Sequence, residues 1–144
     1  MSRHAARERV LQTLFQMDLN RLSPTQAASY THALLDDEPE ADYFEGLLQG
    51  VLNKMSYIDE LIGQYAQDWT MDRMPGVDRN ILRIGAYELV FEKNIPDAVA
   101  LDEAVELSKQ YGTEQSPKFI NGVLAGVLRD LEDIKKNVQG MQAT

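Results

Sequence analysis

The sequence has 144 residues, 44% of them hydrophobic and none of them cysteine, and its formal net charge at pH 7 is −9 from 14 basic and 23 acidic residues. This length suits one domain with a buried core, and the missing cysteine excludes disulfides and thiolate metal sites. The sequence shows no apolar run of about 18 residues and no signal-peptide pattern, so we expect a cytoplasmic protein without membrane contact.

A first helix is predicted over residues 3–19, where apolar side chains recur at three- and four-residue steps. Arg3 and Arg7 are four residues apart and share a face, with His4 beside them. Charges at a helix start are usually solvated. Residues 1–9 nevertheless hold three arginines against one glutamate, which makes this end a small basic patch on an acidic chain.

A second helix is predicted over residues 23–35. Ser23 is an N-cap residue, and Gln26 stands three positions later, where it can complete a capping box. His32 has no second ligand at metal spacing, so we interpret it as a structural or surface histidine. The acidic stretch 36–42 lacks the alternating ligands and the glycine of a calcium loop, so we interpret it as a solvated linker.

Three more helices are predicted in the middle of the chain. The first covers residues 41–55, and Ser56 is expected to cap the next. Trp69 follows a polar break and is expected to be a packing anchor between helices. The stretch 77–92 is apolar almost all round, so it should be the central buried helix. Gly85 in its middle costs up to about 1 kcal/mol in helix propensity, which close helix packing would explain.

The last part of the chain predicts helix, tight turn and helix. The first of these helices covers residues 97–111, and Gly112 is expected to adopt a left-handed conformation at its end. Ser116 is expected to cap the second helix. The tail, residues 136–144, loses periodicity and is expected to be frayed. Because no strand alternation is present, the fold class should be all-α, with about seven helices.

Lys118 and Phe119 lie in the first turn of that last helix. The backbone N–H groups there favour an anion. A cation and an aromatic ring at this place could hold a phosphate and stack a base. The alternative is that Phe119 belongs to the core and Lys118 is solvated.

Four stretches of the chain resemble the NusB family of transcription antitermination factors. The longest is residues 103–124, E-A-V-E-L-S-K-Q-Y-G-T-E-Q-S-P-K-F-I-N-G-V-L, which matches the C-terminal signature of the family without a gap. Residues 6–15 (A-R-E-R-V-L-Q-T-L-F), 42–52 and 77–89 (V-D-R-N-I-L-R-I-G-A-Y-E-L) are also similar to family segments.

The resemblance implies a single helical domain over residues 1–135, built from two three-helix bundles packed together. It also implies a transcription antitermination factor that binds single-stranded boxA RNA of nascent ribosomal transcripts together with the ribosomal protein NusE. In that role the protein would join the antitermination complex of RNA polymerase.

The resemblance also assigns contacts to individual residues. The RNA contacts that it implies are at Arg3, His4, Arg7, Gln12, Gln115, Lys118 and Phe119. The NusE contacts that it implies are at Phe15, Asp78 and Arg79. Phosphate and sugar would meet the first three RNA residues, and Phe119 would stack on a base. Gln115 stands where many family members carry aspartate, and an amide is less repulsive to phosphate.

Two other classes of function remain open from the sequence. The chain could be a helical protein-interaction module, or a homodimer that masks the same face, without RNA specificity of its own. An enzyme is not expected, because the chain has no cysteine nucleophile, no histidine pair and no phosphate-binding glycine loop. No cofactor and no metal are expected.

Overall fold

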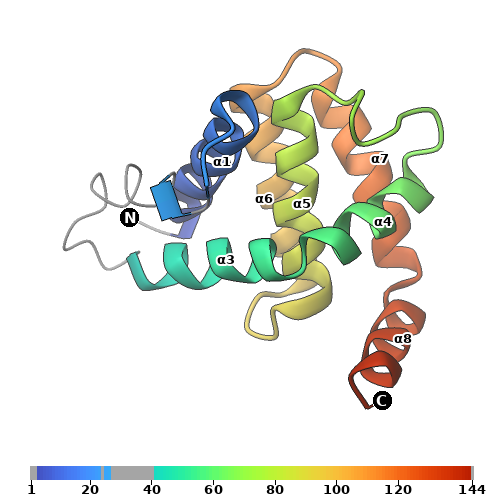
Figure 1. Cartoon of the computed structure of the whole chain (residues 1–144). Helices are drawn as coiled ribbons and strands as arrows, with labels where there is room; N and C mark the ends of the chain where they lie inside the picture. The colour runs from blue at the N-terminus through green and yellow to red at the C-terminus, as the bar shows by residue number, and fades with distance from the viewer. Residues whose placement is uncertain (1–2, 24, 27–40, 144) are drawn as a thin grey trace.

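The computed structural model describes residues 3–23, 25–26 and 41–143, and these form seven helices and no strand (Figure 1). The helices are α1 Arg3–Asn20, α3 Ala41–Asn53, α4 Met55–Tyr65, α5 Gly76–Phe91, α6 Asp97–Tyr111, α7 Ser116–Arg129 and α8 Leu131–Ala143. The all-α prediction is confirmed. None of these helices is long and apolar enough to cross a bilayer.

The start of the predicted second helix is confirmed by its capping box. The Ser23 N–H donates to Gln26 Oε1 at 3.0 Å, and the Gln26 N–H donates to Ser23 Oγ at 3.2 Å. These reciprocal bonds satisfy two backbone donors at a helix start. The rest of that helix, with His32, and positions 36–40 of the acidic stretch lie outside the described residues.

The boundary between α3 and α4 differs from the prediction by two residues. Helix α4 begins at Met55, and Lys54 is its N-cap without a side-chain hydrogen bond. The Lys54 N–H still donates to Gly50 O at 3.1 Å, while the Lys54 carbonyl already accepts from Ile58 at 2.9 Å. One residue therefore ends α3 and starts α4, so Ser56 lies inside the first turn and is not a cap.

Helix α5 is the central buried helix, as predicted. It packs against α1, α3, α4, α6, α7 and α8, and Figure 1 shows it between α1 and α7. A Cβ on Gly85 would lie 2.6 Å from Leu124 Cδ1 and 3.3 Å from Ala104 Cβ. Glycine is therefore needed here because α6 and α7 approach the α5 backbone closely.

The helices fall into two groups that share α5. Helices α1 and α3 pack against each other and against α5. On its other sides α5 contacts α6, α7 and α4, and α6 and α7 form the second closely packed pair. Of the predicted pair of three-helix bundles, the second helix of the first bundle falls among the residues not described.

The prediction of a frayed tail is wrong for the backbone. Helix α8 continues to Ala143 and packs against α5 and α7. Leu131, Ile134 and Val138 are spaced as one helical face, and all three are buried. Val138, in the middle of the predicted tail, is only 8% exposed. The polar composition of the tail hid this short apolar stripe.

Candidate nucleic-acid interface

A groove of about 810 Å³ lies at the N-terminal end of α7. Its lining comes from two segments of the chain, residues 65–78 and residues 113–123. Gln115, Lys118 and Phe119, three residues predicted to contact RNA, all line it. The structure therefore brings together the predicted RNA residues of the C-terminal half.

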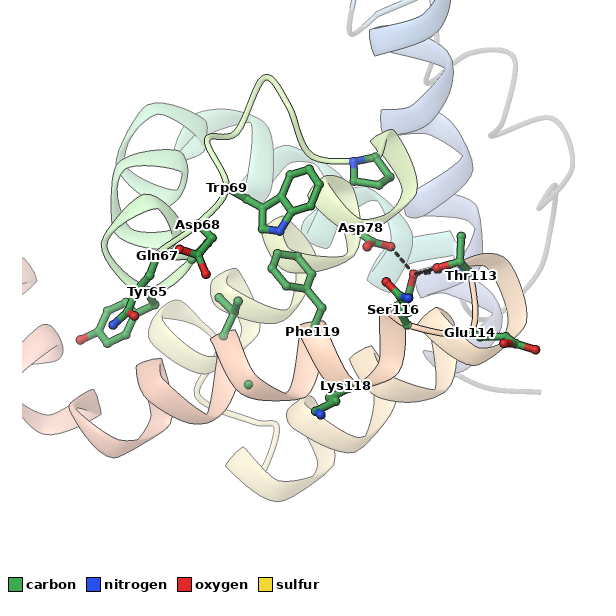
Figure 2. Close-up of a pocket in the computed structure, with 15 residues that line it drawn as sticks. Tyr65, Gln67, Asp68, Trp69, Asp78, Thr113, Glu114, Ser116, Lys118 and Phe119 are labelled. Carbon is green, nitrogen blue, oxygen red and sulfur yellow. Dashed lines mark hydrogen bonds between the residues drawn. The ribbon is translucent and has the colours of Figure 1, made fainter.

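Phe119 and Trp69 form an aromatic pair inside this groove (Figure 2). Their ring centroids are 6.5 Å apart and their planes are inclined by 67°, an edge-to-face arrangement. Phe119 is half-buried and packs against the hydrophobic core. Phe119 therefore belongs to both the core and the groove, because part of the ring packs against core residues and part of it lines the groove.

Trp69 is not the buried packing anchor expected from the sequence. It is 47% exposed, one of the most exposed large hydrophobic side chains in the described residues. Lys118 is exposed too, and it has no ion-pair partner within the part of the chain that the structure describes. The sequence held no signal for Trp69 beyond its place after a polar break, since its neighbour Phe119 is 50 positions away in the chain.

The turn before α7 is built differently from the prediction. Gly112 has φ −95° and ψ −165°, so it is extended and not left-handed. Ser116 is the first residue of α7, and Gln115 is the N-cap. Ser116 Oγ accepts a hydrogen bond from the Thr113 N–H at 2.9 Å. A Cβ on Gly112 would lie 2.5 Å from Ser116 Oγ, so glycine provides room for this serine.

Asp78 connects that turn to α5. The hydroxyl of Ser116 donates to Asp78 Oδ1 at 2.8 Å, and the Asp78 side chain lines the groove (Figure 2). Asp78 is only 5% exposed. Burial raises the pKa of Asp78, whereas the hydrogen bond from Ser116 favours the ionised carboxylate. The structure therefore assigns Asp78 to the floor of the groove and not to an exposed partner contact.

Replacing Asp78 with asparagine is expected to change how stability depends on pH. The folded-state pKa of Asp78 lies above its unfolded value of about 3.9, so its contribution to stability is complete below that pH. The contribution is lost as pH rises through the folded-state pKa. The unfolding free energy of the wild type, relative to Asp78→Asn, should therefore fall as the pH of urea titrations rises above about 4.

Ser116→Ala provides the control for this pH dependence. It removes the hydrogen bond that favours the ionised carboxylate, so the fall with rising pH should become larger. A difference between the wild type and Asp78→Asn that is the same at every pH would contradict the assignment.

Arg7 is not available for a phosphate. Its side chain is 3% exposed, and its Nε and Nη2 donate to the two oxygens of Glu88 at 2.8 and 2.9 Å. The hydroxyl of Tyr43 also donates to Glu88. The prediction that Arg7 contacts RNA is therefore wrong in this structure, because its side of α1 faces α5 instead of solvent.

Arg3 and His4 remain closer to the surface. Arg3 is exposed, and its guanidinium lies 4.9 Å from the centroid of the Tyr43 ring. His4 Nδ1 lies 2.7 Å from Glu103 Oε2, and its Nε2 lies 3.0 Å from Gln110 Oε1. The hydrogen bond to Glu103 raises the pKa of His4. His4 therefore joins the start of α1 to α6. Arg3 and Arg9 are the cations at this end that have no carboxylate partner among the described residues.

Gln12 lies on α1, three residues after Arg9. It is half-buried and accepts a hydrogen bond from Arg9 Nη1 at 2.9 Å. On the same helix, Glu8 accepts a hydrogen bond from the hydroxyl of Tyr111, the last residue of α6. Because the turn that leads into α7 begins directly after Tyr111, this bond through Glu8 joins α1 to the start of that turn.

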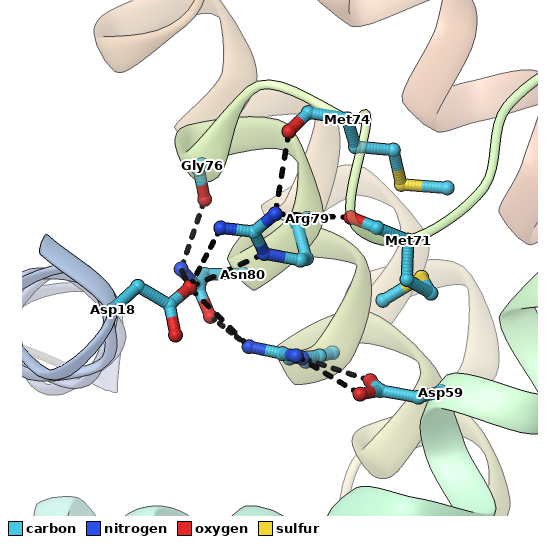
Figure 3. Close-up of polar contacts among 8 residues, drawn as sticks. Asp18, Asp59, Met71, Met74, Gly76, Arg79 and Asn80 are labelled. Atoms are coloured by element: carbon cyan, nitrogen blue, oxygen red, sulfur yellow. Dashed lines mark hydrogen bonds and ion pairs between the residues drawn. The ribbon is translucent and has the colours of Figure 1, made fainter. Parts of the chain in front are cut away.

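Phe15 and Arg79, two of the predicted partner contacts, lie together at the start of α5. Arg79 Nη2 pairs with Asp18 Oδ2 at 3.0 Å, and its Nη1 donates to the carbonyl of Met71 at 2.9 Å (Figure 3). The Phe15 ring is 3.2 Å from the place of a Cβ on Gly76. The third predicted contact, Asp78, belongs to the groove, so the structure divides the predicted set.

A polar network that the sequence did not predict supports this end of α5. Arg83 holds both oxygens of Asp59, at 2.8 and 2.9 Å, and donates to Asn80 Oδ1 at 2.9 Å. Asn80 in turn donates to Asp18 at 3.0 Å (Figure 3). The network joins α1, α4 and α5. Among the described residues no group of histidine and carboxylate side chains could hold a metal ion.

Comparison with known proteins gives the family of the chain. The NusB family model matches residues 4–129. The transcription antitermination protein NusB of Bacillus pumilus is 46% identical over 133 residues, which are 92% of this chain and 98% of that protein. The NusB protein of Streptomyces avermitilis is 47% identical over 135 residues, 91% of this chain and 93% of that protein.

Solved structures agree with the sequence relatives. The structure of T. maritima NusB has a TM-score of 0.84 and 37% identity, over 90% of this chain and 92% of that one. A chain from the crystal structure of the antitermination factors NusB and NusE with double-stranded RNA has a TM-score of 0.79 and 27% identity, over 90% and 98% of the two chains. With its all-helical fold and these matches, the chain belongs to the NusB family.

Proposed function

We propose that this chain is a transcription antitermination factor that binds single-stranded boxA RNA of nascent ribosomal transcripts together with NusE. The observation that carries the proposal is the groove at the start of α7, which gathers Gln115, Lys118 and Phe119. An exposed cation and an aromatic ring beside a helix N-terminus suit a phosphate and an unstacked base. Relatives that bear the antitermination name, and a neighbour in a complex with NusE and RNA, support it.

The charges of the chain explain why a basic partner would be needed. The net charge is −9. Two arginines already pair with carboxylates inside the protein: Arg7 with Glu88, and Arg83 with Asp59. Neutralisation of phosphates supplies most of the affinity for nucleic acid. With Arg3, Arg9 and Lys118 as the main cations left at the interface, the chain alone should bind RNA weakly.

We place the contact with NusE around Phe15 and Arg79, at the start of α5. Leu19, near the end of α1, is 64% exposed, which adds apolar surface next to Asp18 and its ion pair with Arg79. The role is one of binding and not of catalysis, carried out in the cytoplasm within the antitermination complex of RNA polymerase. Asp78 lines the groove, whereas Phe15 and Arg79 lie outside it. NusE bound at Phe15 and Arg79 would therefore leave the groove free for RNA.

The test is fluorescence anisotropy with a labelled boxA RNA and a scrambled RNA of the same composition, each with and without the NusE of the same organism. We expect weak binding by the chain alone, and tighter binding to boxA than to the scrambled RNA when NusE is present. Equal binding to both RNAs that NusE does not change would contradict the proposal. Size-exclusion chromatography with and without RNA would then show whether a homodimer occupies the same face.

A further inference from the structure

The groove at the start of α7 contains an aromatic pair, Trp69 and Phe119, which a site for phosphate alone does not need. Trp69 is half exposed and touches Phe119 edge to face, so a broad aromatic surface remains open to solvent. Tryptophan is highly buried on average, and an exposed one beside a second ring commonly marks a binding surface. The open aromatic surface suits a flat, apolar ligand face such as a nucleobase.

The polar groups around these rings have the wrong sign for a phosphate inside the groove. Asp68, Asp78 and Glu114 line it, and Lys118 is the one cation among the lining residues. Asp68 and Glu114 are exposed and have no hydrogen-bond or ion-pair partner among the residues that the structure describes. Carboxylates in this state accept hydrogen bonds from N–H groups of a ligand.

The edges of the four RNA bases differ in the donors that they offer to a carboxylate. Guanine presents an N–H and an amino group side by side, so it can donate twice to one carboxylate. Cytosine and adenine each present an amino group. Uracil presents one N–H between two carbonyl oxygens, which a carboxylate repels. A carboxylate beside the aromatic pair, as Asp68 is, would therefore discriminate against uracil.

We propose that the groove seats one unstacked RNA base against Trp69 and Phe119, and that Asp68 selects guanine, and after it cytosine or adenine, over uracil. This inference rests on the proposed function, because it names a base-selective subsite within the same RNA interface. Figure 2 shows the two rings together, with Asp68 on one side and Asp78 and Ser116 on the other.

A nucleic acid fits the groove better than a basic peptide does. The N-terminal end of α7 and Lys118 place positive charge at the edge of the groove. A phosphate that follows the seated base would meet this charge favourably, whereas an arginine or lysine of a peptide would be repelled there. The groove also contains Gln115 and Phe119, two of the residues predicted to contact RNA.

The chain offers a direct reporter, because Trp69 is its single tryptophan. The probes are a 12-residue oligouridylate and three copies of it that carry one central guanine, cytosine or adenine. They are added to the full chain with NusE present. Stacking of a base on the indole should quench its fluorescence. We expect the guanine oligonucleotide to quench most strongly and to bind at least about fivefold more tightly than oligouridylate.

Matched variants separate stacking from selection. Trp69→Ala should weaken binding of the guanine oligonucleotide about tenfold, and Trp69→Phe should retain most of the affinity because an aromatic face remains. Asp68→Asn should reduce the preference for guanine over uracil while oligouridylate binds as before or better. Glu114→Gln should leave this preference unchanged, because the Glu114 side chain points away from the two rings (Figure 2). Val99→Ala, which alters an exposed apolar residue on α6, is the control and should change nothing.

The outcomes distinguish this inference from the proposed function. If boxA RNA binds by anisotropy while Trp69 fluorescence is unchanged and Trp69→Ala binds normally, the base seat is overturned and the function stands. Equal quenching and binding by all four oligonucleotides overturns the selection by Asp68. Quenching by an oligoarginine peptide but by no RNA assigns the groove to a basic protein and overturns the inference. Failure of boxA RNA to bind at all overturns both proposals.

Discussion

Arg7→Ala is expected to lower the free energy of unfolding by about 3–5 kcal/mol, the largest effect on stability that we expect from a single substitution. The pair of Arg7 with Glu88 is buried, with side chains 3% and 1% exposed. Removal of the arginine leaves a buried carboxylate whose remaining donor is the hydroxyl of Tyr43. An uncompensated buried charge is costly because water cannot solvate it. Urea unfolding followed by circular dichroism measures the change.

Two variants test whether the lost pair is the cause. The double substitution Arg7→Met with Glu88→Leu removes both charges, so it should regain most of the stability. Arg3→Ala removes a neighbouring exposed arginine and should change the unfolding free energy by less than about 0.5 kcal/mol. If Arg7→Ala leaves stability unchanged but flattens the salt dependence of RNA binding, Arg7 contacts phosphate and the buried pair is not its main role.

Phe119→Ala is expected to weaken RNA binding by about 1–3 kcal/mol, or roughly 5- to 150-fold, if the ring stacks on a base. It should also lower stability, because one side of the ring packs against the core. The loss of stability should be smaller than the about 3–5 kcal/mol of a fully buried phenylalanine, since the ring is half-buried. Anisotropy with boxA RNA and NusE measures the first effect, and urea unfolding measures the second.

Phe119→Leu separates these two effects. Leucine keeps most of the apolar volume that faces the core, but it has no aromatic face for a base. The variant should be nearly as stable as the wild type and should bind RNA almost as weakly as Phe119→Ala. Unchanged RNA binding by Phe119→Leu would show that the ring serves the core alone.

Local signals in the sequence predicted the helices well. The capping box of Ser23 and Gln26 depends on two residues three positions apart, so it could be found without any knowledge of the fold. Periodicity likewise placed the central helix within one residue at each end. The need for Gly85 could be inferred because a glycine within a strong helix pattern implies close packing, and Leu124 and Ala104 supply it.

The errors occurred where a side chain depends on a partner far away in the chain. From the sequence, Arg7 is expected to be solvated at the start of a helix. Its ion pair with Glu88 depends on a residue 81 positions later. Ser116 looks like a helix cap, but its hydroxyl donates to Asp78, 38 positions away. The role of Trp69 depends on Phe119 in the same way. Such pairs are set by the packing of helices, which periodicity does not determine.

The position of α5 has a consequence for how the molecule opens. Because α5 contacts every other described helix, neither group of helices can separate while the other keeps its packing. We therefore expect the backbone amides of α5 to exchange with deuterium only when the whole chain unfolds, as one cooperative unit. A ligand that binds only the native state would then slow exchange throughout the core, including amides far from the groove, by the same factor.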